Sequence, residues 1–381
     1  MLRASSCEPR DLANPIFGVR LACLVSTLAA LACGPSEPEV LTGPPTTLYI
    51  SPGGDDQNDG RSPQTPLKRL ERAIQLARGG DTIVVLQGTY SESFENQDIG
   101  SESSVMIIRG QDAETRPVFD GQNQMLFMWR CTGCKNLLIE NLEIRNYRAN
   151  GILFSRSQDI TIRNLRFVNV ARVSDPDGYV EGGSSAIAAL DEAIRITIEN
   201  NKIEDSGFRD LNTDDAGMLI NCWRCKDSAI RKNTVRNYEG VGILVEESCR
   251  VTATDNRVEA GRNRMVDWWT SALWVDGGRD ITVSNNAFQD NEGPGIQASD
   301  TEVVYPEGLS KGFKFIGNTS TRNKYGIYIW NYGQCPAPTD AVYLENNTFS
   351  GNSDKDIYCV EWECGVGQPC VDATGPNVNC G

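Results

Sequence analysis

The sequence ITIENNKI at residues 196–203 is one copy of an eight-residue frame that recurs along the chain. The eight copies begin at residues 137, 160, 196, 228, 251, 281, 313 and 342, at intervals of 23, 36, 32, 23, 30, 32 and 29 residues. Apolar residues at positions one and three predict a strand with one buried face. The two intervals of 23 residues indicate a basic coil, and the longer intervals indicate the same coil with inserted loops.

Position six of the frame is asparagine in six of the eight copies. These residues are Asn201, Asn233, Asn256, Asn286, Asn318 and Asn347. Asparagine tolerates a left-handed backbone, and stacked asparagine side chains can hydrogen-bond to one another. We therefore expect these six residues to form a column at one corner of a solenoid.

A second short strand precedes most frames. Examples are GILF at 151–154, GILV at 242–245 and GIYI at 326–329. Each coil is therefore predicted to contain at least two strands, and successive coils to stack about 4.8 Å apart. The amphipathic pattern of residues 66–78 predicts a helix that caps the first coil, and the cysteine-rich tail at 359–381 is expected to close the other end.

The composition excludes several classes of function. Apolar residues make up 39% and charged residues 23% of the 381 residues, which is typical of a folded globular chain. The net charge of -15 argues against nucleic-acid binding, because phosphate contacts need a concentrated basic face. The chain contains no histidine, which excludes a Ser-His-Asp triad, a histidine-ligated zinc site and histidine-based acid–base catalysis.

The N-terminal sequence predicts export. The apolar run at 21–32 is too short to span a bilayer but fits the core of a signal peptide. It ends in Ala30-Leu-Ala-Cys33, which resembles a bacterial lipobox with alanine in the place of the usual leucine. We therefore predict a signal peptide at 1–32, lipidation of Cys33 and a Pro-rich tether at 33–47. Cleavage without lipid is the alternative.

These features predict where the protein resides and what it contacts. The expected location is the bacterial outer membrane, on its periplasmic or its cell-surface face. The lipid anchor would be the only contact with the membrane, and the chain is expected to be a monomer.

Thirteen cysteines also favour an oxidising compartment. The pairs Cys131/Cys134 and Cys222/Cys225 each have the spacing of half a zinc site. Three coils separate the two pairs, which places them roughly 14 Å apart, too far for one metal ion. Disulfides are therefore predicted, either local or between adjacent coils, for example between Cys225 and Cys249.

Residues 48–90 carry a resemblance to a known superfamily. The features are a Tyr-x-Ser-Pro start at 49–52, an Asp/Asn/Gly loop, the amphipathic pattern, and the step from GDTI at 80–83 to GTY at 88–90. This segment resembles the start of pectate-lyase-like β-helix proteins, especially family-9 polysaccharide lyases and their relatives. The resemblance implies an all-β fold, a single-stranded right-handed parallel β-helix over residues 48–381. It implies little about activity, because the superfamily includes lyases, hydrolases, epimerases and non-catalytic proteins.

In these relatives ligands lie along one parallel sheet, between loops that lead into it. The Gly-Ile strands correspond to that sheet, and acidic or aromatic loops at 168–185, 204–216 and 259–271 precede three of them. Carboxylate oxygens are the ligands that Ca²⁺ prefers. The predicted Ca²⁺ ligands are Asp175, Asp177, Asp210, Asp214 and Asp215.

One hypothesis is a Ca²⁺-dependent polyuronate lyase acting by β-elimination. The ion would neutralise a uronate carboxylate and acidify the adjacent ring proton, which a base then removes. Family-9 lyases use a lysine base, but none of the three loops contains lysine. By analogy with other lyases of this fold, Arg209, Arg262 or Arg264 would act as the base. In the alternative interpretation the aspartates make solenoid turns and keep the surface soluble.

The Asn-Thr-Asp sequence at 212–214 resembles polygalacturonase hydrolases. Those enzymes also need a histidine, so hydrolysis or epimerisation by a histidine-dependent mechanism is not expected.

Aromatic residues give the clearer binding signal. Strand alternation points Trp274, Tyr328 and Trp330 away from the Ile/Val core, where together with Trp268 and Trp269 they would stack on sugar rings. Packing under the loops or against another protein is the alternative. The sequence thus favours a polysaccharide-binding protein, whose ligand is acidic if it is a lyase. The competing hypothesis is a non-catalytic adhesion or scaffold protein with the same architecture.

Overall fold

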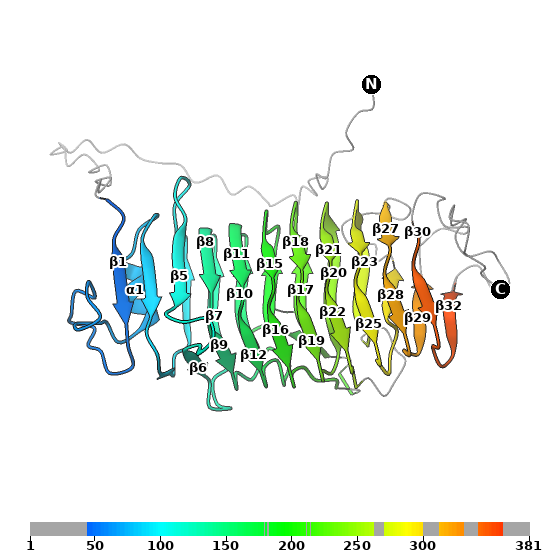
Figure 1. The fold of residues 1–381 in the computed structure, drawn as a ribbon, viewed down its shortest axis with the longest axis horizontal. Coiled ribbons are helices and arrows are strands. Elements are labelled where there is room, and N and C mark those ends of the chain that lie inside the picture. The colour runs from blue at the N-terminus through cyan, green and yellow to red at the C-terminus, as the bar shows by residue number, and fades with distance from the viewer. Residues whose placement is uncertain are drawn as a thin grey trace, which may run out of the picture. The chain divides into compact units, whose positions relative to one another are not determined.

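The computed structural model describes residues 44–178, 180, 183–210, 212–213, 215–262, 270–299, 312–330 and 342–360. Apart from Pro44, these residues belong to one unit, Pro45–Gly381. The strands form three long sheets in which successive turns of the chain lie side by side (Figure 1). Every pair of neighbouring strands in these sheets is parallel, as the solenoid prediction requires; examples are β11 with β15, β16 with β19 and β20 with β23.

Sheet 1 and sheet 3 together contain the repeated frame. Sheet 1 consists of β1 (Thr47–Ile50), β2 (Thr82–Val85), β5 (Met106–Gly110), β8 (Lys135–Glu140), β11 (Gln158–Arg163), β15 (Thr197–Glu199), β18 (Ala229–Arg231), β21 (Thr252–Thr254), β24 (Thr282–Ser284), β27 (Phe313–Ile316) and β30 (Val342–Glu345). Sheet 3 consists of β3 (Thr89–Tyr90), β6 (Val118–Asp120), β9 (Glu143–Arg145), β12 (Arg166–Val168), β16 (Lys202–Glu204), β19 (Thr234–Arg236), β22 (Arg257–Glu259), β25 (Ala287–Gln289), β28 (Thr319–Thr321) and β31 (Thr348–Ser350).

Sheet 2 contains the predicted Gly-Ile strands. It consists of β4 (Phe94–Gln97), β7 (Phe127–Thr132), β10 (Asn150–Ser155), β14 (Ile187–Leu190), β17 (Ala216–Trp223), β20 (Val241–Cys249), β23 (Leu273–Arg279), β26 (Ile296–Ser299), β29 (Tyr325–Trp330) and β32 (Lys355–Val360), with β13 (Gly183–Ser184) beside β17. A complete coil therefore contributes three strands, one to each sheet, where the sequence predicted at least two. The single-stranded right-handed parallel β-helix is confirmed.

The asparagine column is also confirmed. Each side-chain amide donates to the Oδ1 of the next asparagine, over 3.0 Å from Asn201 to Asn233 and 2.9 Å from Asn318 to Asn347. The three links between them measure 2.9 to 3.0 Å, and five of the six side chains, all except Asn347, are almost fully buried. The side-chain amides of the column thus satisfy one another's hydrogen-bonding groups inside the corner between sheets 1 and 3.

The left-handed backbone conformation was predicted at position six of the frame, the position of this column. That prediction was wrong by one position. The left-handed residue of each corner is position five of the frame, for example Asn200 (φ 54°), Lys232 (φ 57°) and Asp255 (φ 57°). Position five makes the sharp turn, and position six then directs its side chain into the interior. A second column, Asn291, Asn323 and Asn352, was not predicted and forms another corner; for example, Asn291 Nδ2 donates to Asn323 Oδ1 over 2.8 Å.

The first coil is covered by α1 (Leu70–Leu76), which is shorter than the predicted 66–78 segment. Leu70, Ala73 and Ile74 are buried in the interior core, beside β1 and β2. The backbone N–H groups of Leu70 and Glu71 donate to the Glu92 carboxylate over 3.0 and 3.3 Å. Burial of this carboxyl raises the pKa of Glu92 to about 7, although these hydrogen bonds oppose the rise.

Two parts of the predicted domain plan lie beyond what the structure describes. The signal peptide with Cys33 lies outside the described residues, as does all of the cysteine-rich tail after Val360. Within the described residues no helix is long and apolar enough to cross a membrane.

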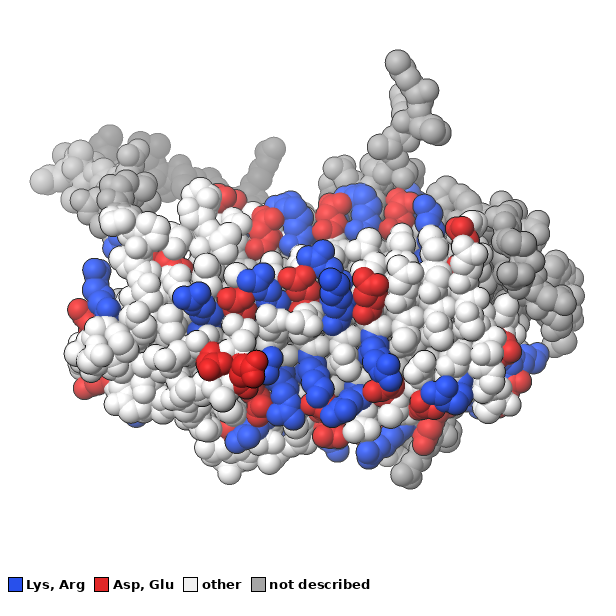
Figure 2. All heavy atoms as spheres, viewed as in Figure 1, with Lys and Arg blue, Asp and Glu red and all other residues white. Residues whose placement is uncertain are grey.

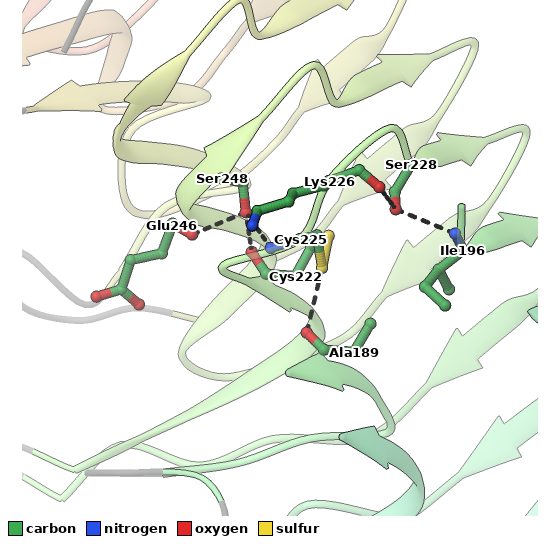
Figure 3. Close-up of a disulfide and its surroundings, with 8 residues drawn as sticks. All are labelled: Ala189, Ile196, Cys222, Cys225, Lys226, Ser228, Glu246 and Ser248. Atoms are coloured by element: carbon green, nitrogen blue, oxygen red, sulfur yellow. Dashed lines mark hydrogen bonds between the residues drawn. A yellow bond between two sulfur atoms is a disulfide. The ribbon is translucent and has the colours of Figure 1, made fainter. Parts of the chain in front are cut away.

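The cysteine pairs form local disulfides, Cys131–Cys134 and Cys222–Cys225. The suggested Cys225–Cys249 bridge was wrong, because Cys225 bonds to its neighbour in the same turn (Figure 3). Ser248 of the next coil fixes this turn, accepting from the Cys225 N–H over 2.9 Å and donating to the Cys222 carbonyl over 3.0 Å. The disulfides join the end of a sheet 2 strand to the following corner.

Candidate functional site

The outer face of sheet 2 carries two columns of side chains, because residues two apart on a strand point the same way. The first outer column is Glu95, Arg130, Leu153, Ala188, Asn221, Leu244, Trp274, Gln297, Tyr328 and Tyr358, one residue per strand. The second outer column includes Thr132, Ser155, Leu190, Trp223, Glu246, Asp276, Ser299 and Trp330.

Trp274, Tyr328 and Trp330 lie on this outer face, as predicted. They belong to an apolar cluster separate from the interior core. Their rings are nevertheless buried, with 2%, 7% and 6% of their surface exposed. Trp274 and Trp330 have ring centroids 6.2 Å apart, and Tyr328 stacks on Trp330 at 6.3 Å. The placement is compatible with both predicted roles, sugar stacking and packing beneath loops.

Three half-buried aromatic residues on or beside this face were not singled out from the sequence. Trp223 lies in the second outer column, and Tyr325 and Tyr358 lie in β29 and β32. Tyr358 stacks on Tyr325 at 4.9 Å and on Tyr328 at 5.4 Å. Lys355 Nζ lies 4.6 Å from the centroid of the Tyr358 ring. Strand alternation would have found Trp223 and Tyr358 once the strands were aligned.

Arg130 organises the N-terminal part of the outer face. Its guanidinium is buried, and Nη2 donates to both carboxylate oxygens of Asp175 over 2.8 and 3.0 Å. Nη1 donates to Asp177 over 2.7 Å and to Glu95 over 3.3 Å. Asn150 Nδ2 also donates to Asp175, over 2.7 Å. Arg130 therefore ties the first acidic loop onto the sheet.

These contacts bear on the predicted Ca²⁺ ligands. Both oxygens of Asp175, and one oxygen of Asp177, already bind Arg130. Asp210 Oδ1 accepts from the backbone N–H of Asn212 over 2.9 Å. In the described part of the chain, no three His, Cys, Asp or Glu side chains form a group suited to a metal ion. The described residues thus do not provide a Ca²⁺ site; Asp214 lies outside them, and Asp215 is described but not part of such a group.

Of the three arginines predicted as bases, Arg209 forms hydrogen bonds within its own loop. Its Nη1 donates to the carbonyl oxygens of Asp210 and Asp215 over 2.9 and 3.1 Å. Arg262 is exposed, and its backbone N–H donates to the Tyr238 carbonyl over 2.8 Å.

The three loops are not all neighbours along sheet 2. Loops 168–185 and 204–216 lead into the adjacent strands β14 and β17. Loop 259–271 leads into β23, and the short connection between β19 and β20 separates it from the second loop. Arg264, Trp268 and Trp269 of this third loop lie outside the described residues, and their roles remain predictions.

Two further carboxylates, Glu246 and Asp276, were missed by the sequence reasoning. They are register partners on β20 and β23 in the second outer column. Asp276 is 3% exposed and Glu246 is half-buried. Their separation of 30 residues equals the interval between the frames at 251 and 281, which is a signal that the sequence contained.

Comparisons with known proteins agree with this architecture. A family model described as "Right handed beta helix region" matches residues 130–272 and 260–349. The uncharacterized protein YwoF of Bacillus subtilis (strain 168) is 24% identical over 353 residues, which cover 82% of this chain and 70% of that protein.

Two solved structures share the fold at low sequence identity. Pectate lyase Pel9A has a TM-score of 0.53 and 13% identity, with 83% of this chain and 79% of that chain covered. The alginate lyase from Paenibacillus sp. str. FPU-7 has a TM-score of 0.52 and 14% identity, with 76% and 95% covered.

Proposed function

The chain belongs to the right-handed β-helix family, and from this premise we propose that it binds a polysaccharide along the outer face of sheet 2. The observation that carries the proposal is the series of aromatic side chains that successive coils place on this face. Trp274 of β23, Trp330 of β29 and Tyr358 of β32 belong to it. Aromatic faces pack well against the apolar faces of sugar rings.

The extent of the aromatic face favours a polymer over a single sugar. Trp223 of β17 and Tyr358 of β32 are five strands apart in the order of sheet 2. At about 4.8 Å per strand this corresponds to roughly 24 Å, a length that several linked sugar rings are needed to span. The names of the two similar structures, a pectate lyase and an alginate lyase, support the same ligand class.

The test is binding to a panel of immobilised polysaccharides: polygalacturonate, alginate, xylan, chitin and an uncharged β-glucan. The double variant Tyr325→Ala/Tyr358→Ala should weaken binding about tenfold or more, because two half-buried rings are removed. Tyr343→Ala is the matched control, since Tyr343 is a half-buried tyrosine on sheet 1. Failure of every polymer to bind would refute the proposal.

Ca²⁺-dependent elimination remains a separate prediction that no described residue favours, because Arg130 already binds Asp175 and Asp177. Its measurement is the release of ultraviolet-absorbing unsaturated products from polygalacturonate or alginate, with Ca²⁺ and with a chelator. Binding without any product would instead favour the non-catalytic adhesion or scaffold hypothesis.

Export and lipidation complete the proposal. An outer-membrane anchor at Cys33 would hold the β-helix near the polysaccharides of the cell envelope or its surroundings. Cys33→Ser should abolish incorporation of a labelled fatty acid and release the protein from the membrane fraction. Unchanged fractionation of this variant would contradict the anchor.

A further inference from the structure

The outer face of sheet 2 carries a buried side-chain amide whose hydrogen-bonding groups are almost unused. Asn221 of β17 lies in the first outer column, between Ala188 of β14 and Leu244 of β20. It is 3% exposed, and among the described residues its Oδ1 accepts no hydrogen bond. Its Nδ2 faces the Met218 sulfur at 3.5 Å. A thioether sulfur is a weak acceptor, so both ends of the amide can still bind a stronger partner.

Comparable amides elsewhere in the solenoid have partners at both ends. The asparagines of the corner columns bond to one another, and Asn150 of β10 is the example on the same face as Asn221. Asn150 Nδ2 donates to Asp175 over 2.7 Å, and its Oδ1 accepts from the Ser185 backbone N–H over 2.9 Å. A buried acceptor without a donor is costly. Asn221 thus departs from a rule that the rest of the fold obeys, and such departures point to a functional residue.

The neighbours of Asn221 cannot supply the missing donor. Ala188, Leu244 and Met218 belong to the apolar cluster of the outer face, together with Val180 of the loop at 168–185. None of these side chains carries a hydrogen-bond donor. A donor for Asn221 Oδ1 therefore has to come from outside the protein.

Met218 is the side chain that covers the amide, and it can move. It is 2% exposed, and the backbone of Gly183 packs against its methyl group, since a Cβ on Gly183 would lie 2.9 Å from Met218 Cε. Methionine is unbranched and has three rotatable bonds, so it changes rotamer more easily than the other apolar residues of the cluster. Rotation of Met218 would uncover Asn221 while β17 keeps its place in the sheet.

An aromatic ring lies next to this amide on the same strand. Trp223 follows Asn221 by two residues on β17, so both side chains leave the sheet on its outer face. At about 3.3 Å per residue the two positions are roughly 6.6 Å apart, within reach of one sugar ring and its hydroxyl groups. Trp223 is half-buried and packs against the edge of the apolar cluster.

We infer that Asn221 and Trp223 form a subsite that recognises two adjacent hydroxyl groups of one sugar unit; this inference rests on the proposed polysaccharide binding. The sugar ring stacks on Trp223, one hydroxyl donates to Asn221 Oδ1, and the neighbouring hydroxyl accepts from Asn221 Nδ2. The donor and the acceptor of an amide lie side by side, as adjacent hydroxyl groups do. The ligand class is therefore a polysaccharide whose units carry two adjacent unsubstituted hydroxyl groups. Xylan, alginate and polygalacturonate have such units, whereas in chitin an acetamido group replaces one hydroxyl of the pair.

The experiment compares the affinities of the full-length protein for these polymers. The wild type should bind at least one of xylan, alginate and polygalacturonate at least tenfold more tightly than chitin. Chemical O-acetylation of that polymer should weaken binding by a similar factor, because a site built to bond a hydroxyl rejects a ligand that lacks it. Alkaline removal of the acetyl groups should restore the affinity, which excludes damage to the polymer as the cause.

Two variants separate recognition by Asn221 from a structural role. Asn221→Leu should weaken binding to the unmodified polymer at least tenfold and nearly abolish the preference over its acetylated form. Its unfolding midpoint should be unchanged or higher, because leucine fits the apolar cluster without burying an unpaired amide. Asn150→Leu should instead lower the midpoint, since it removes an amide with partners at both ends. Tyr343→Ala is again the control for affinity.

Each result bears on the inference. Wild-type affinity of Asn221→Leu, a marked loss of its stability, or equal binding of a polymer and its acetylated form would overturn the subsite and leave polysaccharide binding intact. Chitin binding as tight as that of the other three polymers would do the same. Absence of binding to any polymer of the panel would refute the proposed function itself, and the subsite with it.

Discussion

The outer faces of sheets 1 and 3 differ from the outer face of sheet 2 in the contacts that side chains of successive coils make with one another. On sheets 1 and 3, residues of successive coils form ion pairs, such as Arg163–Glu140 and Arg231–Glu199, both at 2.7 Å. Figure 2 shows basic and acidic residues alternating in rows across one face of the molecule. Sheet 2 has the Arg130–Glu95 ion pair on its N-terminal strands, whereas its C-terminal strands present mainly aromatic rings. Ion pairs between successive coils thus recur along sheets 1 and 3, while the C-terminal half of sheet 2 is dominated by aromatic side chains.

Two glutamates outside sheet 2, Glu204 on sheet 3 and Glu92 beside α1, differ in their pKa. Although burial raises the pKa of Glu204, hydrogen bonds from Lys202, Arg166 and Arg236 outweigh it and hold this pKa below its usual value. Glu92 has a pKa raised to about 7 by burial. Burial thus raises the pKa of Glu92, whereas hydrogen bonds from three cations keep the pKa of Glu204 low despite burial.

The largest expected effect separates a buried charge on sheet 2 from an exposed one on sheet 1. Arg130→Ala should lower the free energy of unfolding by about 3 to 5 kcal/mol, because it leaves the buried Asp175 carboxylate without its cation. Arg163→Ala removes a partly exposed partner of Glu140 and should cost about 0 to 1 kcal/mol. Denaturant unfolding of both variants measures this; equal losses would contradict the contrast between the two faces.

The second prediction concerns Glu92, whose pKa is about 7 in the fold and near 4.5 when unfolded. Between these values the unfolded chain ionises first, so stability should fall by roughly 2 to 3 kcal/mol as the pH rises from 4.5 to 7. Glu92→Gln should remove this decline and be more stable than the wild type at pH 8. Thermal unfolding at pH 5 and pH 8 measures both effects; a parallel decline in the variant would argue against Glu92.

A third prediction addresses binding at the Trp223 end of the aromatic face. Trp223→Ala should weaken polysaccharide binding by 0.5 to 1.5 kcal/mol, about three- to tenfold, because one stacking ring is lost. The unfolding midpoint should change little, since the ring is half-buried and packs on the guanidinium of Arg224 at 4.3 Å. Affinity electrophoresis provides the measurement. An affinity equal to that of Tyr343→Ala would restrict the binding face to β23–β32.

The smallest effect is expected on sheet 1. Glu199→Gln breaks the ion pair with Arg231, whose side chain is 48% exposed, and should cost less than about 1 kcal/mol. High salt should erase the difference from the wild type, because it screens exposed charges. Unfolding in low and high salt tests this. A larger loss that persists in high salt would show that these ion pairs stabilise the solenoid more than their exposure suggests.

The solenoid could be predicted from the sequence because the eight-residue frame recurs. Each copy contains the inward-facing residues of one strand of sheet 1 and one strand of sheet 3, together with the corner between them. The asparagine column followed directly, since position six recurs in register. The position of the left-handed residue was missed although the sequence held a signal for it, because position five is asparagine in five of the eight frames and Lys232, Asp255 or Gly317 in the other three.

The site was less predictable because variable loops separate the sheet 2 strands from one another and from the next frame. Trp274 and Trp330 could be placed outward from local alternation alone. The contact of Arg130 with Asp175 joins positions 45 residues apart across a loop, and no periodicity predicts it. Glu246 and Asp276 could have been paired, since they keep the same distance to the frames that follow them.

The asparagine column also governs how such a protein can change length. An asparagine within the column donates its amide to one neighbour, and its Oδ1 accepts from the other, as Asn256 does between Asn233 and Asn286. An insertion within the frame would displace one amide and interrupt the series, whereas a whole added coil would extend it. Evolutionary or engineered lengthening should therefore proceed by duplicating complete coils, while diversity accumulates in the loops ahead of sheet 2.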